Sequence, residues 1–162
     1  MPTDIVTSDV IICEIEIAAP PERVFRALTD PEQLAQWFRN PECPAKVWEM
    51  DARVGGLYRY VTEKGSMVVN NVSQFECHGE IVECDPPRRL AYTWIANWHD
   101  DVSRRTVVRW ELAPRAGGTH VKVTHSGLAS LPIAREDYTG GWPGVLEMLK
   151  KFTESVETRR AS

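Results

Sequence analysis

The sequence predicts an α+β fold in which a curved antiparallel sheet of about six or seven strands is closed by a long C-terminal helix. Three features predict it: alternating segments through the middle of the chain, two short helical segments after the first strand, and one long amphipathic segment near the end. The 162 residues, 43% hydrophobic and 26% charged, suit one domain. We expect residues 1–9 to be disordered and residues 10–158 to form this domain.

The first elements follow from alternation and from helix-start signals. Residues 11–17 alternate apolar and acidic side chains, the pattern of a half-buried strand. The proline pair at residues 20–21 predicts the start of a short helix. A second short helix is expected after Asp30, which is suited to be its N-cap, with Gln33 closing a capping box.

A series of strands is expected next, at residues 47–50, 57–62, 67–84, 90–96, 104–112 and 119–125. The segment 67–84 is long for one strand, so Asn70-Asn71 and Gly79 are expected to mark a break and a bulge. Elsewhere the alternation is sharp: Val108 and Trp110 share one face while charged side chains occupy the other. One face of the sheet is therefore expected to be covered and the other solvated.

The cover is the last segment, where Trp142, Val145, Leu149 and Phe152 recur at helical spacing. This predicts a helix of roughly 15–20 residues, with Pro143 in its first turn. Because one helix cannot cover every apolar position of a wide curved sheet, we expect an apolar cavity between helix and sheet, the kind of space in which small molecules bind.

Several segments also carry a resemblance to known proteins. They are residues 17–31, 37–38, 54–56, 79–83, 85–90, 92–94, 124–128 and 141–146. Over about residues 10–155 the chain resembles the START-like superfamily (polyketide cyclase and lipid-transport proteins, SRPBCC), and within it the bacterial proteins related to the C-terminal domain of the activator of heat-shock-protein-90 ATPase. The resemblance implies a helix-grip, pollen-allergen-like fold. It does not fix a function, because one fold serves many activities.

Aromatic side chains on the inferred inner faces are the first candidates for the cavity wall, since buried indole N–H groups need acceptors that a ligand can supply. The expected lining is Trp37, Phe38, Trp48, Tyr58, Tyr60, Tyr92, Trp94, Trp98, Trp110, His125, Trp142, Val145 and Leu149. The alternative is that these are ordinary core residues. For His125 the alternatives are a core histidine satisfied by the protein, a ligand contact, or a general acid or base.

The loop at residues 97–103, which carries Trp98, is either a lid over one end of the cavity or a plain hairpin loop. Elsewhere we find no zinc-ligand spacing, no phosphate-binding loop and no nucleophile elbow. We therefore expect no catalytic residue, no metal and no cofactor.

A formal net charge of −4 argues against nucleic acid as a partner, and no apolar run is long enough to span a membrane. The N-terminal sequence has no signal-peptide pattern and the four cysteines have no disulfide spacing, which favours the cytoplasm. The expected partner is a small hydrophobic ligand, with a homodimer or a protein partner left open.

Three functions follow, in order of preference. The first is a carrier or sensor of a small hydrophobic or aromatic molecule, in a stress-related or other role. The second is a protein-interaction module resembling the chaperone ATPase activator, which needs a broad exposed apolar patch. The third is a cavity enzyme of cyclase or dehydratase type, for which His125 with Tyr58 or Tyr60 is the best available polar pair.

Overall fold

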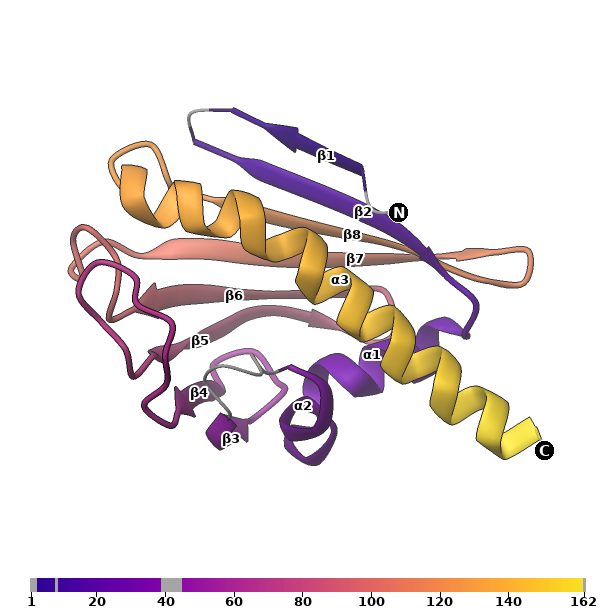
Figure 1. Ribbon diagram of the computed structural model, residues 1–162. Helices are drawn as coiled ribbons and strands as arrows, with labels where there is room; N and C mark the ends of the chain where they lie inside the picture. Colours follow the sequence, from indigo (N-terminus) through magenta and orange to yellow (C-terminus); the bar gives the residue numbers. More distant parts are fainter. Residues whose placement is uncertain (1–2, 8, 39–44, 162) are drawn as a thin grey trace.

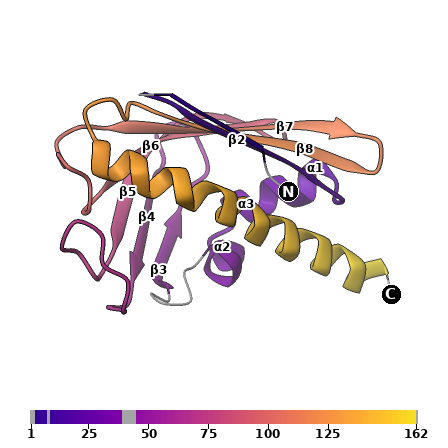
Figure 2. The same ribbon diagram turned by 45° about the horizontal axis from the view of Figure 1, so that its top comes forward.

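A single curved sheet holds the strands, and α3 runs along one face of it (Figures 1 and 2). The computed structural model describes residues 3–7, 9–38 and 45–161. Within them the sheet has eight strands in the order β1-β2-β8-β7-β6-β5-β4-β3, each antiparallel to its neighbours. The strands are β1 (Thr3–Val6), β2 (Ile11–Ile17), β3 (Ala45–Met50), β4 (Leu57–Thr62), β5 (Glu76–Asp85), β6 (Arg89–Ala96), β7 (Thr106–Arg115) and β8 (Gly118–Ser126). The helices are α1 (Pro21–Thr29), α2 (Pro31–Trp37) and α3 (Pro132–Ala161).

The predicted fold class is confirmed, with one strand more than expected. The additional strand is β1, which pairs with β2 where the sequence predicts a disordered N-terminus. Its apolar side chains give no burial signal, because Ile5 is 58% exposed and Val6 is 43% exposed, while its backbone pairs with β2. Residues 1, 2 and 8 of that segment lie outside the described residues.

The inner face of the sheet is apolar and the outer face is charged, as the alternation predicts. On β7, Val108, Trp110 and Leu112 are buried, whereas Arg109 is exposed and pairs with Glu83 of β5. The inner face meets α3, with α1 and α2 placed beside the C-terminal half of that helix (Figure 1).

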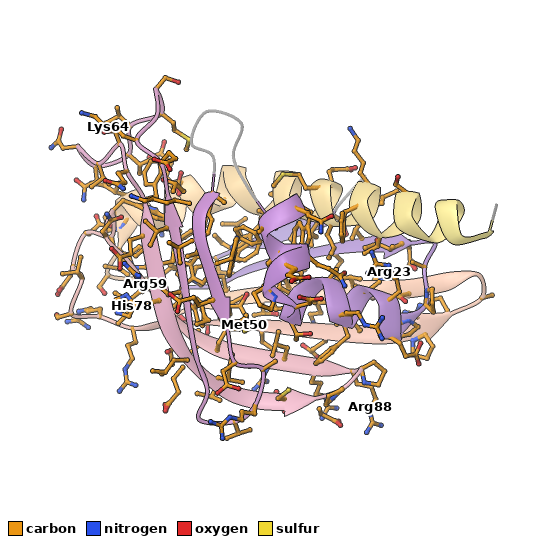
Figure 3. All side chains as sticks on the ribbon, turned by 90° about the horizontal axis from the view of Figure 1, so that it is seen from below. Arg23, Met50, Arg59, Lys64, His78 and Arg88 are labelled. Atoms are coloured by element: carbon orange, nitrogen blue, oxygen red, sulfur yellow. The ribbon has the colours of Figure 1, made fainter. Side chains whose placement is uncertain are left out.

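The two short helices begin where the sequence places them. The Asp30 carboxylate accepts the N–H of Glu32 at 2.9 Å, as an N-cap does. Gln33 contacts the Asp30 carboxylate rather than the backbone of a capping box. Arg23, labelled in Figure 3, joins the helices: its guanidinium donates to the Gln33 side chain at 2.6 Å and lies over the Phe152 ring of α3.

Helix α3 has 30 residues and begins at Pro132, well before the predicted start near Trp142. Pro143 therefore lies inside the helix rather than in its first turn. The cause lies elsewhere in the chain: the Asp100 carboxylate accepts the N–H groups of Ile133 and Ala134, both at 3.1 Å. A side chain from the β6–β7 loop thus satisfies backbone donors that the first helical turn leaves unpaired.

The long segment before residue 84 divides as predicted. Asn70 and Asn71 have φ values of 49° and 65° in a tight turn closed by Val69 and Val72, and β5 begins only at Glu76. The β5–β6 ladder has its bulge between Ile81 and Glu83.

At Gly79 the β5–β6 ladder is opened. The Tyr58 hydroxyl donates to the Thr93 carbonyl at 2.6 Å, while the Glu80 N–H is bound by the Thr93 side chain at 2.9 Å. A Cβ at Gly79 would lie 1.9 Å from the Thr93 carbonyl oxygen, so only glycine fits this crossing. The bulge itself, which the sequence predicts at Gly79, forms further along β5.

Candidate functional site

The space between the middle of α3 and the sheet is filled by aromatic side chains in mutual contact. His125 lies with its ring centroid 4.5 Å from that of Tyr138 and 5.8 Å from that of Trp142. Trp110 packs edge-on against Trp142 at 5.7 Å. All four are at most 7% exposed, so this region is a packed core.

Hydrogen bonds fix the state of His125. The Trp142 indole N–H donates to Nδ1 at 3.1 Å, so Nδ1 is an acceptor. On the other side, Nε2 lies 2.7 Å from the Thr106 hydroxyl oxygen, whose hydrogen is donated to the Trp94 carbonyl. Nε2 therefore carries the proton and donates it. Burial lowers the pKa of His125 to about 3, which keeps the ring neutral with both nitrogens bound by the protein.

A second polar group links the β6–β7 loop to α3. The Tyr138 hydroxyl accepts the indole N–H of Trp94 at 2.7 Å and lies 2.7 Å from Nε2 of His99. Burial lowers the pKa of His99 to about 4. Within the described part of the chain, Nδ1 of His99 is buried without a hydrogen-bond partner. The loop thus buries a neutral histidine against the first turns of α3.

Every tryptophan indole N–H has an acceptor inside the protein. The acceptors are the Ala27 carbonyl for Trp37, the Phe38 carbonyl for Trp48, the Tyr138 hydroxyl for Trp94, the Asp137 carboxylate for Trp98, the Tyr92 hydroxyl for Trp110 and the His125 ring for Trp142. None of the six needs a ligand to complete its hydrogen bonding, so these groups alone give no argument for a bound molecule.

A cavity of about 120 Å³ lies at one end of the sheet, beside the start of α3. Its walls are Tyr60, Thr62, Met67, Val69, Phe75, Trp98 and Asp137. They come from β4, the β4–β5 loop, the β6–β7 loop and α3, segments that meet at the left end of Figure 1. Lys64, labelled in Figure 3, marks the β4–β5 loop at this end, far from the β5–β6 turn marked by Arg88.

The cavity wall is mostly apolar, and Asp137 is the one acidic or basic side chain among its described residues. The Thr62 hydroxyl forms a hydrogen bond with the backbone: it accepts the N–H of Phe75 at 2.9 Å. Asp137 accepts the Trp98 indole N–H at 3.1 Å, and burial raises the pKa of its carboxyl. Among the described residues no group of three His, Cys, Asp or Glu side chains is arranged to hold a metal ion.

Of the residues expected to line a cavity, Tyr60 and Trp98 line this one, and Tyr58 borders a separate pocket beside Gly79 and Thr93. Tyr58, Tyr92, Trp94, Trp110, His125, Trp142 and Leu149 lie in the packed core, with Val145 packed against it. Trp37, Phe38 and Trp48 form an aromatic group beside Tyr60, with Trp48 stacked on Tyr60 at 4.7 Å. The structure therefore gathers the aromatic side chains but leaves open space beside few of them.

Sequence reasoning missed Thr62, Met67, Val69, Phe75 and Asp137 of the cavity wall, and Tyr138 and His99 next to it. Asp137 and Tyr138 were missed because the helix was expected to begin later. A signal existed: Ala134, Tyr138, Trp142 and Leu146 recur every four residues and are all buried. Met67, Val69 and Phe75 lie on or beside an irregular loop, where no periodicity reports burial.

The curved antiparallel sheet with a long helix across it defines this as a START-like, helix-grip protein. The sequence pattern of the Activator of Hsp90 ATPase homolog 1-like proteins matches residues 18–154. The chain belongs to that family. The sequence matches none of the curated proteins with which it was compared.

Solved structures agree with this assignment. Protein CV1439 from Chromobacterium violaceum is 30% identical, with a TM-score of 0.74, over 91% of this chain and 99% of that one. A protein from Rhodobacter sphaeroides is 21% identical, with a TM-score of 0.78, over 98% and 99% of the two chains. CalU16 from Micromonospora echinospora is 21% identical, with a TM-score of 0.65, over 98% and 90%. The last two likenesses concern the fold alone.

In the described residues no helix is long and apolar enough to cross a membrane.

Proposed function

We propose that the protein binds a small hydrophobic or aromatic molecule, as a carrier or sensor, in the cavity at the start of α3. The observation that carries the proposal is the cavity itself: about 120 Å³ of space walled by buried aromatic side chains, next to the hydrophobic core. Tyr60 is 6% exposed, Phe75 6% and Trp98 7%. An apolar molecule placed here would restore the dispersion contacts that an unfilled space forgoes.

The polar groups near the helix favour binding over catalysis. A cavity enzyme needs at least two convergent groups able to exchange protons. His125, which was expected to act with Tyr58 or Tyr60, is not available, because both of its ring nitrogens are bound within the core. In the wall of the cavity, Asp137 is the one carboxyl group among the described residues, and the Tyr60 phenol is the other titratable side chain there.

The test uses small neutral aromatic probes, for example toluene, indole and benzyl alcohol, titrated into protein labelled with ¹⁵N. For ligands of so few atoms we expect dissociation constants on the order of 1 mM. Amide shifts should centre on residues 60–75, on Trp98 and on Asp137. A filling substitution, Val69→Phe, should abolish these shifts.

Val68→Phe is the matched control, because Val68 is the neighbouring residue and is 61% exposed. It should leave probe binding unchanged. Shifts spread over the whole surface, or equal binding by both variants, would contradict the cavity as the binding site. Native mass spectrometry of protein purified from its own host then identifies the natural occupant by mass.

A further inference from the structure

We propose that the cavity accepts a substituted ammonium group, held between the Asp137 carboxylate and the aromatic faces of Phe75, Trp98 and Tyr60. This rests on the proposed function and specifies the chemical class of its ligand: an organic cation with alkyl or aryl groups on nitrogen.

The first argument is a carboxylate that pairs with no cation among the described residues. Asp137 accepts one hydrogen bond, from Trp98, and in the part of the chain that the structure describes no ion pair joins it to Lys, Arg or His. The other described side chains lining the cavity are uncharged. Burial raises the pKa of Asp137, as expected when no positive charge offsets the loss of water. A ligand cation supplies that missing charge.

The second argument is the arrangement of the rings. The Phe75 and Trp98 rings meet edge to face, at 84° with centroids 5.0 Å apart, and both line the cavity. Tyr60 adds a third aromatic wall. The negative face of an aromatic ring attracts a cation, and cages of such rings recognise alkylated ammonium groups. Donation of the Trp98 N–H to a carboxylate enriches its ring in electrons and strengthens that attraction.

The same composition disfavours the other ligand classes. An anionic group would be repelled by Asp137 and would find no basic partner among the described residues of the wall. A wholly apolar ligand would fit the rings but would further desolvate an uncompensated carboxylate. An ammonium group with alkyl or aryl substituents can contact the aromatic rings and pair with the carboxylate at the same time.

The experiment compares two probes of the same shape, choline and 3,3-dimethylbutan-1-ol, in which a carbon atom replaces the charged nitrogen. Titrations of the unmodified protein at low ionic strength, followed by NMR, should show choline bound at least about tenfold more tightly than the alcohol. Asp137→Asn keeps an acceptor for the Trp98 N–H but removes the charge. This substitution should lower the affinity for choline at least about tenfold and change the affinity for the alcohol less than about twofold.

Glu136→Gln is the matched control: it removes the same charge from the adjacent, exposed position and should change neither affinity. Equal affinity for the two probes in the unmodified protein would overturn the inference without any variant having to fold. So would choline binding that survives Asp137→Asn. In both cases binding of the alcohol or of the neutral aromatic probes would leave the proposed function standing. Failure of every probe would overturn both.

Discussion

The buried histidines make a quantitative prediction about acid. His125 is 0% exposed and His99 is 3% exposed, and burial holds their pKa values at about 3 and about 4 in the folded protein. In the unfolded chain both take the ordinary value of 6.5. Between these values the unfolded state binds more protons than the folded state, so the free energy of unfolding must decrease as the pH falls below about 6.5.

The size of this decrease follows from the pH range between the pKa values of the folded and unfolded states. Each pH unit below the unfolded pKa, while the folded ring stays neutral, is worth about 1.4 kcal/mol. Acidification from pH 7 to pH 5 therefore costs about 2 kcal/mol for each histidine, or about 4 kcal/mol for the two. That is a large share of the roughly 5–15 kcal/mol that stabilises a typical domain.

Urea denaturation at pH 7 and pH 5 measures this loss, and His125→Gln isolates one contribution. Whatever its stability at pH 7, the variant should lose about 2 kcal/mol less than the unmodified protein between the two pH values. His120→Gln should act in the opposite sense and increase the loss, because Glu14 and Glu16 raise the pKa of the half-buried His120.

The same pH dependence in His125→Gln as in the unmodified protein would refute the reasoning, since His125 would then take up a proton in the folded state. A ¹⁵N NMR spectrum of the imidazoles at pH 5 gives an independent reading. It should show His125 neutral and protonated on Nε2, the form that the Trp142 and Thr106 hydrogen bonds require.

Three further predictions concern stability and are all measurable by urea denaturation. Gly140→Ala should stabilise the protein by about 0.5–1 kcal/mol, because nothing lies near a Cβ at this helical position. Gly79→Ala should destabilise it by more than about 2 kcal/mol, because the added Cβ would collide with the Thr93 carbonyl. Equal effects of the two substitutions would contradict both assignments. Asp100→Ala should cost about 1 kcal/mol and increase hydrogen exchange at Ile133 and Ala134; unchanged exchange there would show that the cap is dispensable. The ion pairs of His120 with Glu14 and Glu16 should contribute less than about 1 kcal/mol to the free energy of unfolding. This contribution should be fully present below pH 6.5 and lost as the pH rises through the raised pKa of His120. A gain in stability across that pH range would contradict the prediction.

Strands were predictable because their signal is local. Residues 57–62 were expected as a strand and form β4 with those bounds, since Tyr58 and Tyr60 alternate with solvent-facing residues such as Arg59. The start of α3 was not, because its cap is Asp100, which is 33 residues from Ile133. Glycines and a proline near Trp142 suggest that the helix starts there. The helix in fact starts at Pro132, and only folding brings the Asp100 carboxylate to that position.

The candidate site shows a different limit. Alternation correctly predicted that Trp94 and Trp110 are buried, and helical spacing did the same for Trp142, but neither pattern tells whether these side chains border open space or each other. That depends on how side chains from distant elements interlock, here through the pairing of Trp142 with His125. The cavity arises instead where the β4–β5 loop meets α3, and that meeting leaves no periodic trace in the sequence.

The β6–β7 loop is attached to α3 through Trp98, His99 and Asp100, and this bears on how a ligand reaches the cavity. Trp98 is tied to Asp137, and Asp100 is tied to the first turn of the same helix, so two adjoining walls are fastened to one another. Across from them, the Asn70 side chain donates to the Trp98 carbonyl at 3.2 Å. Moving the β4–β5 hairpin away from the cavity would therefore break the Asn70 contact, whereas moving the β6–β7 loop away would break its hydrogen bonds to α3.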